Sequence, residues 1–193
     1  VSSEAGYDFF VCPGVSCWFR ILPVFDGAVG NIQGFVRDGA KCGALGMLLT
    51  SWDDGAENLF NCNWHGVAWG AECAWNASTT SIDDFDRRIG GVLFGEPGDH
   101  FGQAIKLLGK THTRAFEWMS TPRFWQHDTL QFTVSREEQR ADCQHLLTLV
   151  DPALAHLRAA KQAAKFNADI LDYFIFGAER IQLLATRMLR QLE

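Results

Sequence analysis

The feature that most constrains the fold is a near-continuous apolar run over residues 43–51, with the sequence GALGMLLTS. A run of this length and composition is typical of a central parallel strand that is buried on both faces. It ends abruptly where polarity returns, at Trp52, Asp53 and Asp54. Because functional residues of parallel α/β folds lie at the carboxyl ends of the strands, we expect these three side chains at a functional edge.

The surrounding segments alternate between strand and helix patterns. Residues 7–12 predict a buried strand that Pro13-Gly14 stops. Apolar residues at helical spacing predict a short helix over 31–42, and residues 64–75 predict a second one. Strand, helix, strand and helix in succession are typical of βα units, and so of a parallel sheet or barrel.

The rest of the chain has a helical pattern. We expect short helices over residues 83–93 and 103–108, and long ones over 136–161 and 166–192. The two long helices are expected to pair as an antiparallel hairpin. Asp151-Pro152 is expected to begin a new helical segment, because proline suits a first helical turn.

Composition and charge narrow the function classes. The net charge of −6 argues against a nucleic-acid partner, which favours a basic face. No apolar run is long enough to span a membrane. The six cysteines form no C-x-x-C pair and no histidine pair has zinc-ligand spacing, so we expect buried thiols, no structural metal and a reducing, cytoplasmic setting.

Three segments resemble a known enzyme family. Residues 43–75, GALGMLLTSWDDGAENLFNCNWHGVAWGAECAW, resemble the last barrel strand and helix of glycoside hydrolase family 20, the β-N-acetylhexosaminidases, with its Trp-x-acidic and Ala-Glu-x-x-Trp motifs. Residues 11–18, VCPGVSCW, resemble the preceding strand in a divergent bacterial branch, and residues 84–95 resemble the segment after the barrel. The resemblance covers about the first half of the chain.

The resemblance implies a fold and a sugar site. Residues 1–80 would be the carboxy-terminal part of a catalytic TIM (β/α)8 barrel, and residues 81–193 a helical region packed against it. Trp52 would form a wall of the pocket for a terminal N-acetylhexosamine, and Trp18 a second wall. Asp54 would hydrogen-bond the outer sugar hydroxyls, although the family usually has Glu there. For Asp53, a direct role and a solvated loop position are equally open.

The resemblance also implies a reaction. In this family the acetamido oxygen of the substrate attacks the anomeric carbon, assisted by an Asp-Glu pair on an earlier barrel strand. We therefore expect no catalytic acid among these 193 residues, and we expect an upstream barrel portion to complete the fold. The expected ligand is a glycan or glycoside that ends in N-acetylglucosamine or N-acetylgalactosamine. No metal or organic cofactor is implied, and an oligomer is possible.

Other interpretations stay open. The chain could belong to another TIM-barrel glycosidase without acetamido preference, or be a noncatalytic helical module that binds a protein partner. Trp52 and Asp54 could be a packed tryptophan and a helix cap, and Trp18 could serve packing. Among the remaining residues we expect Trp69 and Trp75 in the core, His65 on the surface or as a cap, and Glu72 as a buried paired group.

Overall fold

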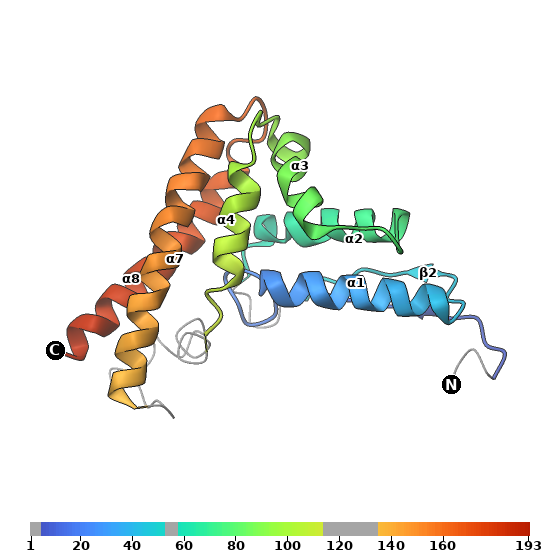
Figure 1. Ribbon diagram of the computed structural model, residues 1–193, viewed down its shortest axis with the longest axis horizontal. Helices are drawn as coiled ribbons and strands as arrows, with labels where there is room; N and C mark the ends of the chain where they lie inside the picture. Colours follow the sequence, from blue (N-terminus) through green and yellow to red (C-terminus); the bar gives the residue numbers. More distant parts are fainter. Residues whose placement is uncertain (1–4, 53–57, 114–134) are drawn as a thin grey trace.

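A computed structural model of the chain describes residues 5–52, 58–113 and 135–193. These ranges hold two short strands and a larger set of helices (Figure 1). In chain order the elements are β1 (Phe10–Val11), α1 (Phe25–Lys41), β2 (Gly46–Met47), the 3-10 helix η1 (Phe60–Asn63), α2 (Trp64–Trp75), α3 (Ile82–Phe94), α4 (His100–Gly109), α7 (Arg136–Ala163) and α8 (Ile170–Gln191). None of the helices in these ranges combines the length and apolar character needed to cross a bilayer.

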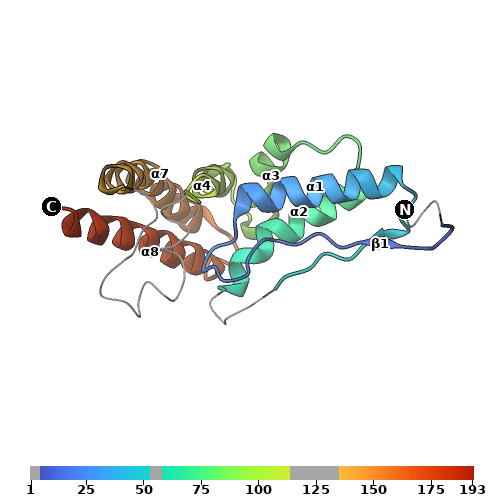
Figure 2. The same ribbon diagram turned by 90° about the horizontal axis from the view of Figure 1, so that it is seen from below.

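The first part of the chain forms the expected β-α-β-α succession. Strands β1 and β2 pair in parallel, with Phe10 opposite Gly46 and Val11 opposite Met47, and α1 forms the crossover between them. Helices α1 and α2 lie side by side along the two strands (Figure 2). The prediction of helix over 64–75 is confirmed, whereas α1 begins six residues earlier than the predicted helix over 31–42.

Glycines let both helices approach the strands closely. A Cβ atom on Gly39 of α1 would lie 2.7 Å from Cγ1 of Val11. A Cβ atom on Gly70 of α2 would lie 2.7 Å from Cδ2 of Leu49. Real Cβ atoms do not approach other atoms so closely, so the backbones of α1 and α2 can pack directly on these side chains only because the glycines have no Cβ atom.

The prediction that residues 43–51 are buried on both faces is wrong for the described chain. Leu45 and Leu48 are each 61% exposed, and the regular strand is limited to β2 and a parallel bridge between Gly14 and Thr50. The reason is that only one face of the strand pair carries helices. The described residues do not form a closed barrel.

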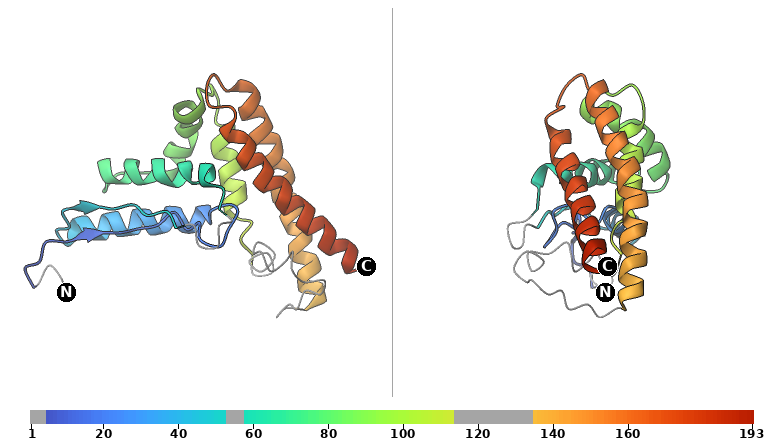
Figure 3. Two further views of the ribbon diagram at one scale, coloured as in Figure 1. Left: turned by 180° about the vertical axis from the view of Figure 1, so that it is seen from behind. Right: turned by 90° about the vertical axis from the view of Figure 1, so that its left-hand side faces the viewer.

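The second part is helical, as predicted, and its long helices form an antiparallel hairpin. Figure 3 shows α7 and α8 running alongside each other. Polar contacts between the two helices pair early residues of one with late residues of the other. They join Arg140 to the carbonyl of Leu192, Asp151 to Gln182, Arg158 to Glu179, and Lys161 to Asp172.

The predicted helix start at Asp151-Pro152 is wrong, because α7 continues through Pro152 without a break. A proline within a helix removes one backbone hydrogen bond. The helix tolerates this since it is anchored on both sides of the proline by a buried apolar face that includes Leu146, Val150, Leu154 and Leu157. At its start, Ser135 and Glu138 form a reciprocal capping box.

One hydrophobic core joins the βα part to the helical part. The ring of Phe25, the first residue of α1, stacks on Phe174 of α8 at a centroid distance of 6.3 Å. Phe101 of α4 meets Phe174 edge-on at 5.1 Å. Nearby, a Cβ atom on Gly177 of α8 would lie 2.5 Å from Leu22. The helical region therefore shares its core with the segment that leads from β1 into α1.

Gly102→Ala should destabilise the 193-residue chain by about 1–3 kcal/mol, the usual range for overpacking. A Cβ atom at this position would lie 2.0 Å from the backbone oxygen of Asp86 in α3, so α4 would have to move away from α3. Gly34→Ala is the matched control, because nothing lies within 4 Å of the added Cβ. It should instead stabilise the helix by about 0.5–1 kcal/mol. Urea unfolding of both variants measures the difference, and equal effects would contradict the packing.

Candidate functional site

The carboxyl ends of the two strands lie side by side. The N–H of Thr50 donates to the carbonyl of Pro13 at 2.8 Å, and the N–H of Val15 donates to the carbonyl of Thr50 at 3.0 Å. The hydroxyl of Thr50 donates to the same Pro13 carbonyl at 3.0 Å. The segments that follow the strands therefore leave the sheet together, which places Trp18 and Trp52 at one edge of the fold.

Both tryptophans are exposed. Trp52 is 57% exposed and Trp18 is 43% exposed. The buried thiol of Cys17 donates to the backbone carbonyl of Trp52 at 3.1 Å, which ties the residue before Trp18 to Trp52 itself. The other two predicted site residues, Asp53 and Asp54, lie outside the described residues.

The turn that carries Trp18 has an unusual backbone. Ser16 and Phe19 have φ angles of 53° and 56°, in the left-handed region that residues other than glycine seldom adopt. Backbone hydrogen bonds hold the turn, from Arg20 N–H to the Cys17 carbonyl and from Val24 N–H to the Ser16 carbonyl. Phe19 is exposed as well. Such conformations store free energy and are concentrated at binding and catalytic sites.

A network of hydrogen-bonded polar side chains, which the sequence analysis missed, holds the segment after β2 in place at this edge. The buried amide of Asn63 donates to the Ser51 hydroxyl at 2.9 Å and to Oδ1 of Asn58 at 2.7 Å. Asn58 donates back to Oδ1 of Asn63 at 3.3 Å. The network holds η1 and the start of α2 beside the strand end. The exposed rings of Phe60 and Trp64 on these helices meet edge-on at 6.3 Å.

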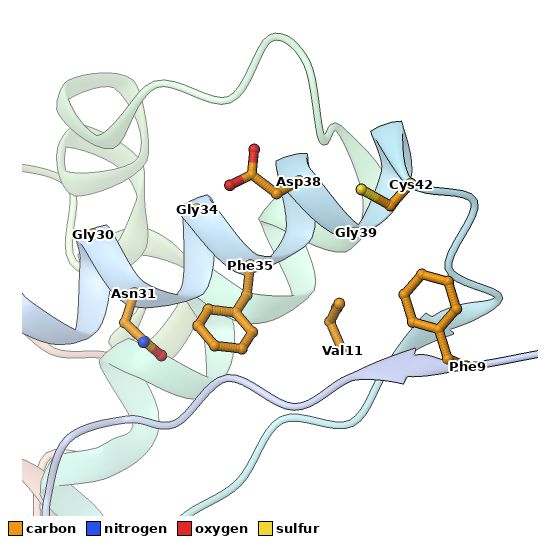
Figure 4. A pocket seen from close by; sticks show the side chains of 9 residues that line it. All are labelled: Phe9, Val11, Gly30, Asn31, Gly34, Phe35, Asp38, Gly39 and Cys42. Atoms are coloured by element: carbon orange, nitrogen blue, oxygen red, sulfur yellow. The ribbon is translucent and has the colours of Figure 1, made fainter. Parts of the chain in front are cut away.

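A groove of about 490 Å³ runs between β1 and α1 (Figure 4). Its walls come from Phe9 and Val11 of the strand segment and from Phe35 of the helix, and Asp38 is the one charged residue among its described lining residues. The lining residue Asn31 accepts a hydrogen bond from the N–H of Gly14 at 3.0 Å. The groove follows the flank of the strand pair, so it offers an apolar packing surface apart from the strand-end tryptophans.

A buried polar pair lies between the helices. Nε2 of His65 lies 3.0 Å from Oδ1 of Asp86, with both side chains almost fully buried. The prediction that His65 is a surface or capping residue is wrong, because the start of α2 is covered by α1, α3 and α4. Nδ1 of His65 has no hydrogen-bond partner among the described residues. The pair joins α2 to α3.

A hollow of about 330 Å³ adjoins this pair. Its rim carries Asp26, Lys110 and the ion pair of Asp83 with Lys106 at 2.7 Å. Burial raises the pKa of Asp26, and the opposite charge of Lys110 works against that rise. The hollow lies among α1 to α4, and three aspartates and two lysines line it, namely Asp26, Asp83, Asp86, Lys106 and Lys110.

Trp69, Trp75 and Glu72 differ in how far their side chains are buried. Trp69 is fully buried, as predicted, and its indole N–H donates to the carbonyl of Val29 at 3.1 Å. Trp75 was expected in the core, which is wrong: it is the last residue of α2 and is 87% exposed. Glu72 is paired as expected, with Arg88 at 3.2 Å, but the pair lies at the surface instead of in the core.

The cysteines are divided between core and surface. Cys17, Cys62, Cys73 and Cys143 are buried, whereas Cys12 and Cys42 are exposed, so the expectation of buried thiols is wrong for these last two. Burial raises the pKa of Cys73 and of Cys143 to about 11. Thiols held in the protonated form are poor nucleophiles. In the described ranges, no three His, Cys, Asp or Glu side chains are arranged to hold a metal ion.

Comparison with family models, curated proteins and solved structures finds no match to the chain. Among the described residues, the strand edge is the candidate site that the geometry favours most. That edge combines exposed aromatic rings, a strained turn and a buried amide network, which the groove and the hollow lack.

Asn63→Ala should destabilise the chain by about 1–3 kcal/mol, because it removes the buried amide that bonds both Asn58 and the Ser51 hydroxyl. It should also loosen the segment that carries Phe60 and Trp64. Asn61→Ala is the control on the same short helix, since the Asn61 side chain takes no part in these hydrogen bonds. Urea unfolding and tryptophan emission report the two effects, and an Asn63 variant as stable as the control would contradict the network.

Proposed function

We propose that this chain is the carboxy-terminal part of a retaining β-N-acetylhexosaminidase and supplies part of its sugar pocket. The observation that carries the proposal is the pair of exposed tryptophans, Trp18 and Trp52, at adjacent carboxyl ends of two parallel strands. In parallel α/β folds this edge holds the substrate. The resemblance of residues 43–75 to the last barrel unit of glycoside hydrolase family 20 supports the same location.

The chemistry of the edge suits a sugar. The C–H face of a pyranose is apolar, so it stacks on a flat indole ring, while its hydroxyls need hydrogen-bonding partners. Trp52 would form the wall on which the terminal N-acetylhexosamine stacks, and Trp18 a second wall. By their place in the sequence directly after Trp52, Asp53 and Asp54 would accept hydrogen bonds from the outer hydroxyls.

The proposed reaction is substrate-assisted. The acetamido oxygen of the substrate attacks the anomeric carbon and forms an oxazolinium intermediate, and water then opens it with retention of configuration. An Asp-Glu pair that orients the acetamido group and protonates the leaving oxygen would come from an earlier strand of the barrel. This chain would contribute binding and orientation, so alone it should bind the sugar weakly and not hydrolyse it.

The open side of the strand pair supports a larger sheet. Among the described residues β1 pairs only with β2, and Phe10 and Leu48 are exposed on the face opposite the helices. Unpaired strand edges are usually covered in native proteins. A right-handed crossover into β1 would bring a preceding helix onto the same face as α1. The groove between β1 and α1 lies where that helix would pack.

Two glycines of α1 point to the same arrangement. Gly30 and Gly34 line the groove, and nothing lies within 4 Å of a Cβ atom added to either one. Glycine destabilises a helix by about 1 kcal/mol relative to alanine. Within the described chain no close contact offsets this cost. A preceding βα unit of the proposed barrel, packed closely against the glycines, would offset it.

The test is hydrolysis of an aryl β-N-acetylglucosaminide and of the matching β-glucoside by the full-length gene product that contains these residues. We expect cleavage of the acetamido sugar only. Trp52→Ala should lower kcat/KM about 10- to 100-fold, which corresponds to about 1.4–2.7 kcal/mol of lost stacking. Trp75→Ala is the matched control, because Trp75 is also exposed but lies at the far end of α2.

The other outcomes of this test would lead to different conclusions. Cleavage of both sugars would indicate a TIM-barrel glycosidase without acetamido preference. No cleavage by a folded protein would overturn the hydrolase proposal. Equal activity of the Trp52 and Trp75 variants would remove Trp52 from the pocket.

A second candidate, a noncatalytic module that binds a protein partner, is favoured by one observation. Helix α8 exposes Tyr173, Phe176 and Leu183, which lie on its surface away from the core residues Phe174 and Leu184. If this module is the function, Phe176→Ala should abolish it while Trp52→Ala has no effect. The hexosaminidase proposal expects the reverse.

A further inference from the structure

Two histidines from different helices meet at the contact between α4 and α7. His100 is the first residue of α4, and His156 lies in the second half of α7, 56 residues later. Their Nδ1 atoms are 3.0 Å apart, and the ring centroids are 5.3 Å apart. Both side chains are partly exposed, so the pair can be reached from solvent.

We propose that His100 and His156 form a two-histidine site for a divalent transition metal of the Ni²⁺ or Cu²⁺ type, bound through both Nδ1 atoms. Imidazole nitrogen is a preferred ligand of these ions. With metal–nitrogen bonds of about 2.0–2.1 Å, nitrogens 3.0 Å apart subtend an angle of about 91–97° at the metal. Octahedral and square-planar ions have this angle, whereas tetrahedral Zn²⁺ prefers a wider one.

The metal would replace the hydrogen bond between the two rings, and the proton on the donor Nδ1 would move to Nε2 of the same ring by exchange with solvent. Without metal, one Nδ1 donates a hydrogen bond to the other. Binding requires the neutral form of both rings with the proton on Nε2, and each ring turns so that both lone pairs converge on the ion. No third His, Cys, Asp or Glu side chain in the described ranges completes a protein-only site, so water would fill the other positions.

Acidic groups nearby favour a cation. Asp99 directly precedes His100 in the chain, and its carboxylate accepts a hydrogen bond from the side-chain amide of Gln103 at 2.8 Å. The buried carboxylate of Glu96 accepts the backbone N–H of His100 at 2.6 Å, which fixes the start of α4.

A metal bound here would connect α4 to the helical hairpin. Because it binds the folded arrangement of two separate helices, it would stabilise the folded state by mass action. The metal would strengthen the contact between α4 and the hairpin of α7 and α8, and this effect is independent of the proposed sugar site.

The test uses the 193-residue chain after treatment with EDTA. Addition of NiCl2 should raise its Tm, and calorimetric titration should give one ion per chain. His100→Gln and His156→Gln should each lose both effects. His145→Gln is the matched control, since His145 is exposed on the same helix α7 and should retain them.

Two results would overturn the site. One is the absence of any Ni²⁺ effect on the unsubstituted chain. The other is an equal rise in Tm for the His100 or His156 variant, which would place the ion elsewhere, for example on the exposed thiols of Cys12 and Cys42. With Cu²⁺, the electron paramagnetic resonance spectrum should show coupling to nitrogen that disappears in either variant.

Discussion

The parallel pairing of β1 and β2 is the constraint on which the rest of the structure depends. Two strands that run in the same direction cannot be joined by a tight turn, so the chain must cross over through a helix, and α1 provides this crossover. The same pairing brings both carboxyl ends to one edge. The hydrogen bonds between Pro13, Val15 and Thr50 continue the pairing to that edge. The positions of Trp18 and Trp52 follow from it.

The helical region stabilises this edge through the core. Leu22 and Phe25 follow the strained turn that carries Trp18, and both pack on α8, against Gly177 and Phe174. A left-handed backbone at residues such as Phe19 persists only where surrounding contacts compensate for its strain. The hairpin of α7 and α8 therefore also supports the backbone of this turn. It holds the chain on one side of the turn, while the thiol of Cys17 holds the other side at Trp52.

Sequence patterns predicted what depends on local periodicity. The helix over 64–75 and the pairing of the long helices follow from apolar spacing, which is a property of neighbouring residues. The exposure of a side chain was harder to predict. Whether Leu48 is buried depends on which other segments of the chain pack over it. The pair of His65 with Asp86, the amide network around Asn63 and the contact of His100 with His156 were beyond prediction. Each joins side chains whose proximity arises only in the folded chain.

Trp69 and Trp52 differ in burial although the backbone is well held at both. Trp69 is buried with its indole N–H satisfied by Val29, as a core tryptophan requires. Trp52 remains exposed although the backbone around it is well held, by the thiol of Cys17 and by the amide that binds neighbouring Ser51. Exposing a large ring forgoes the stabilisation that burial gives. A fixed backbone under an exposed ring is the arrangement expected where the ring is to contact a ligand.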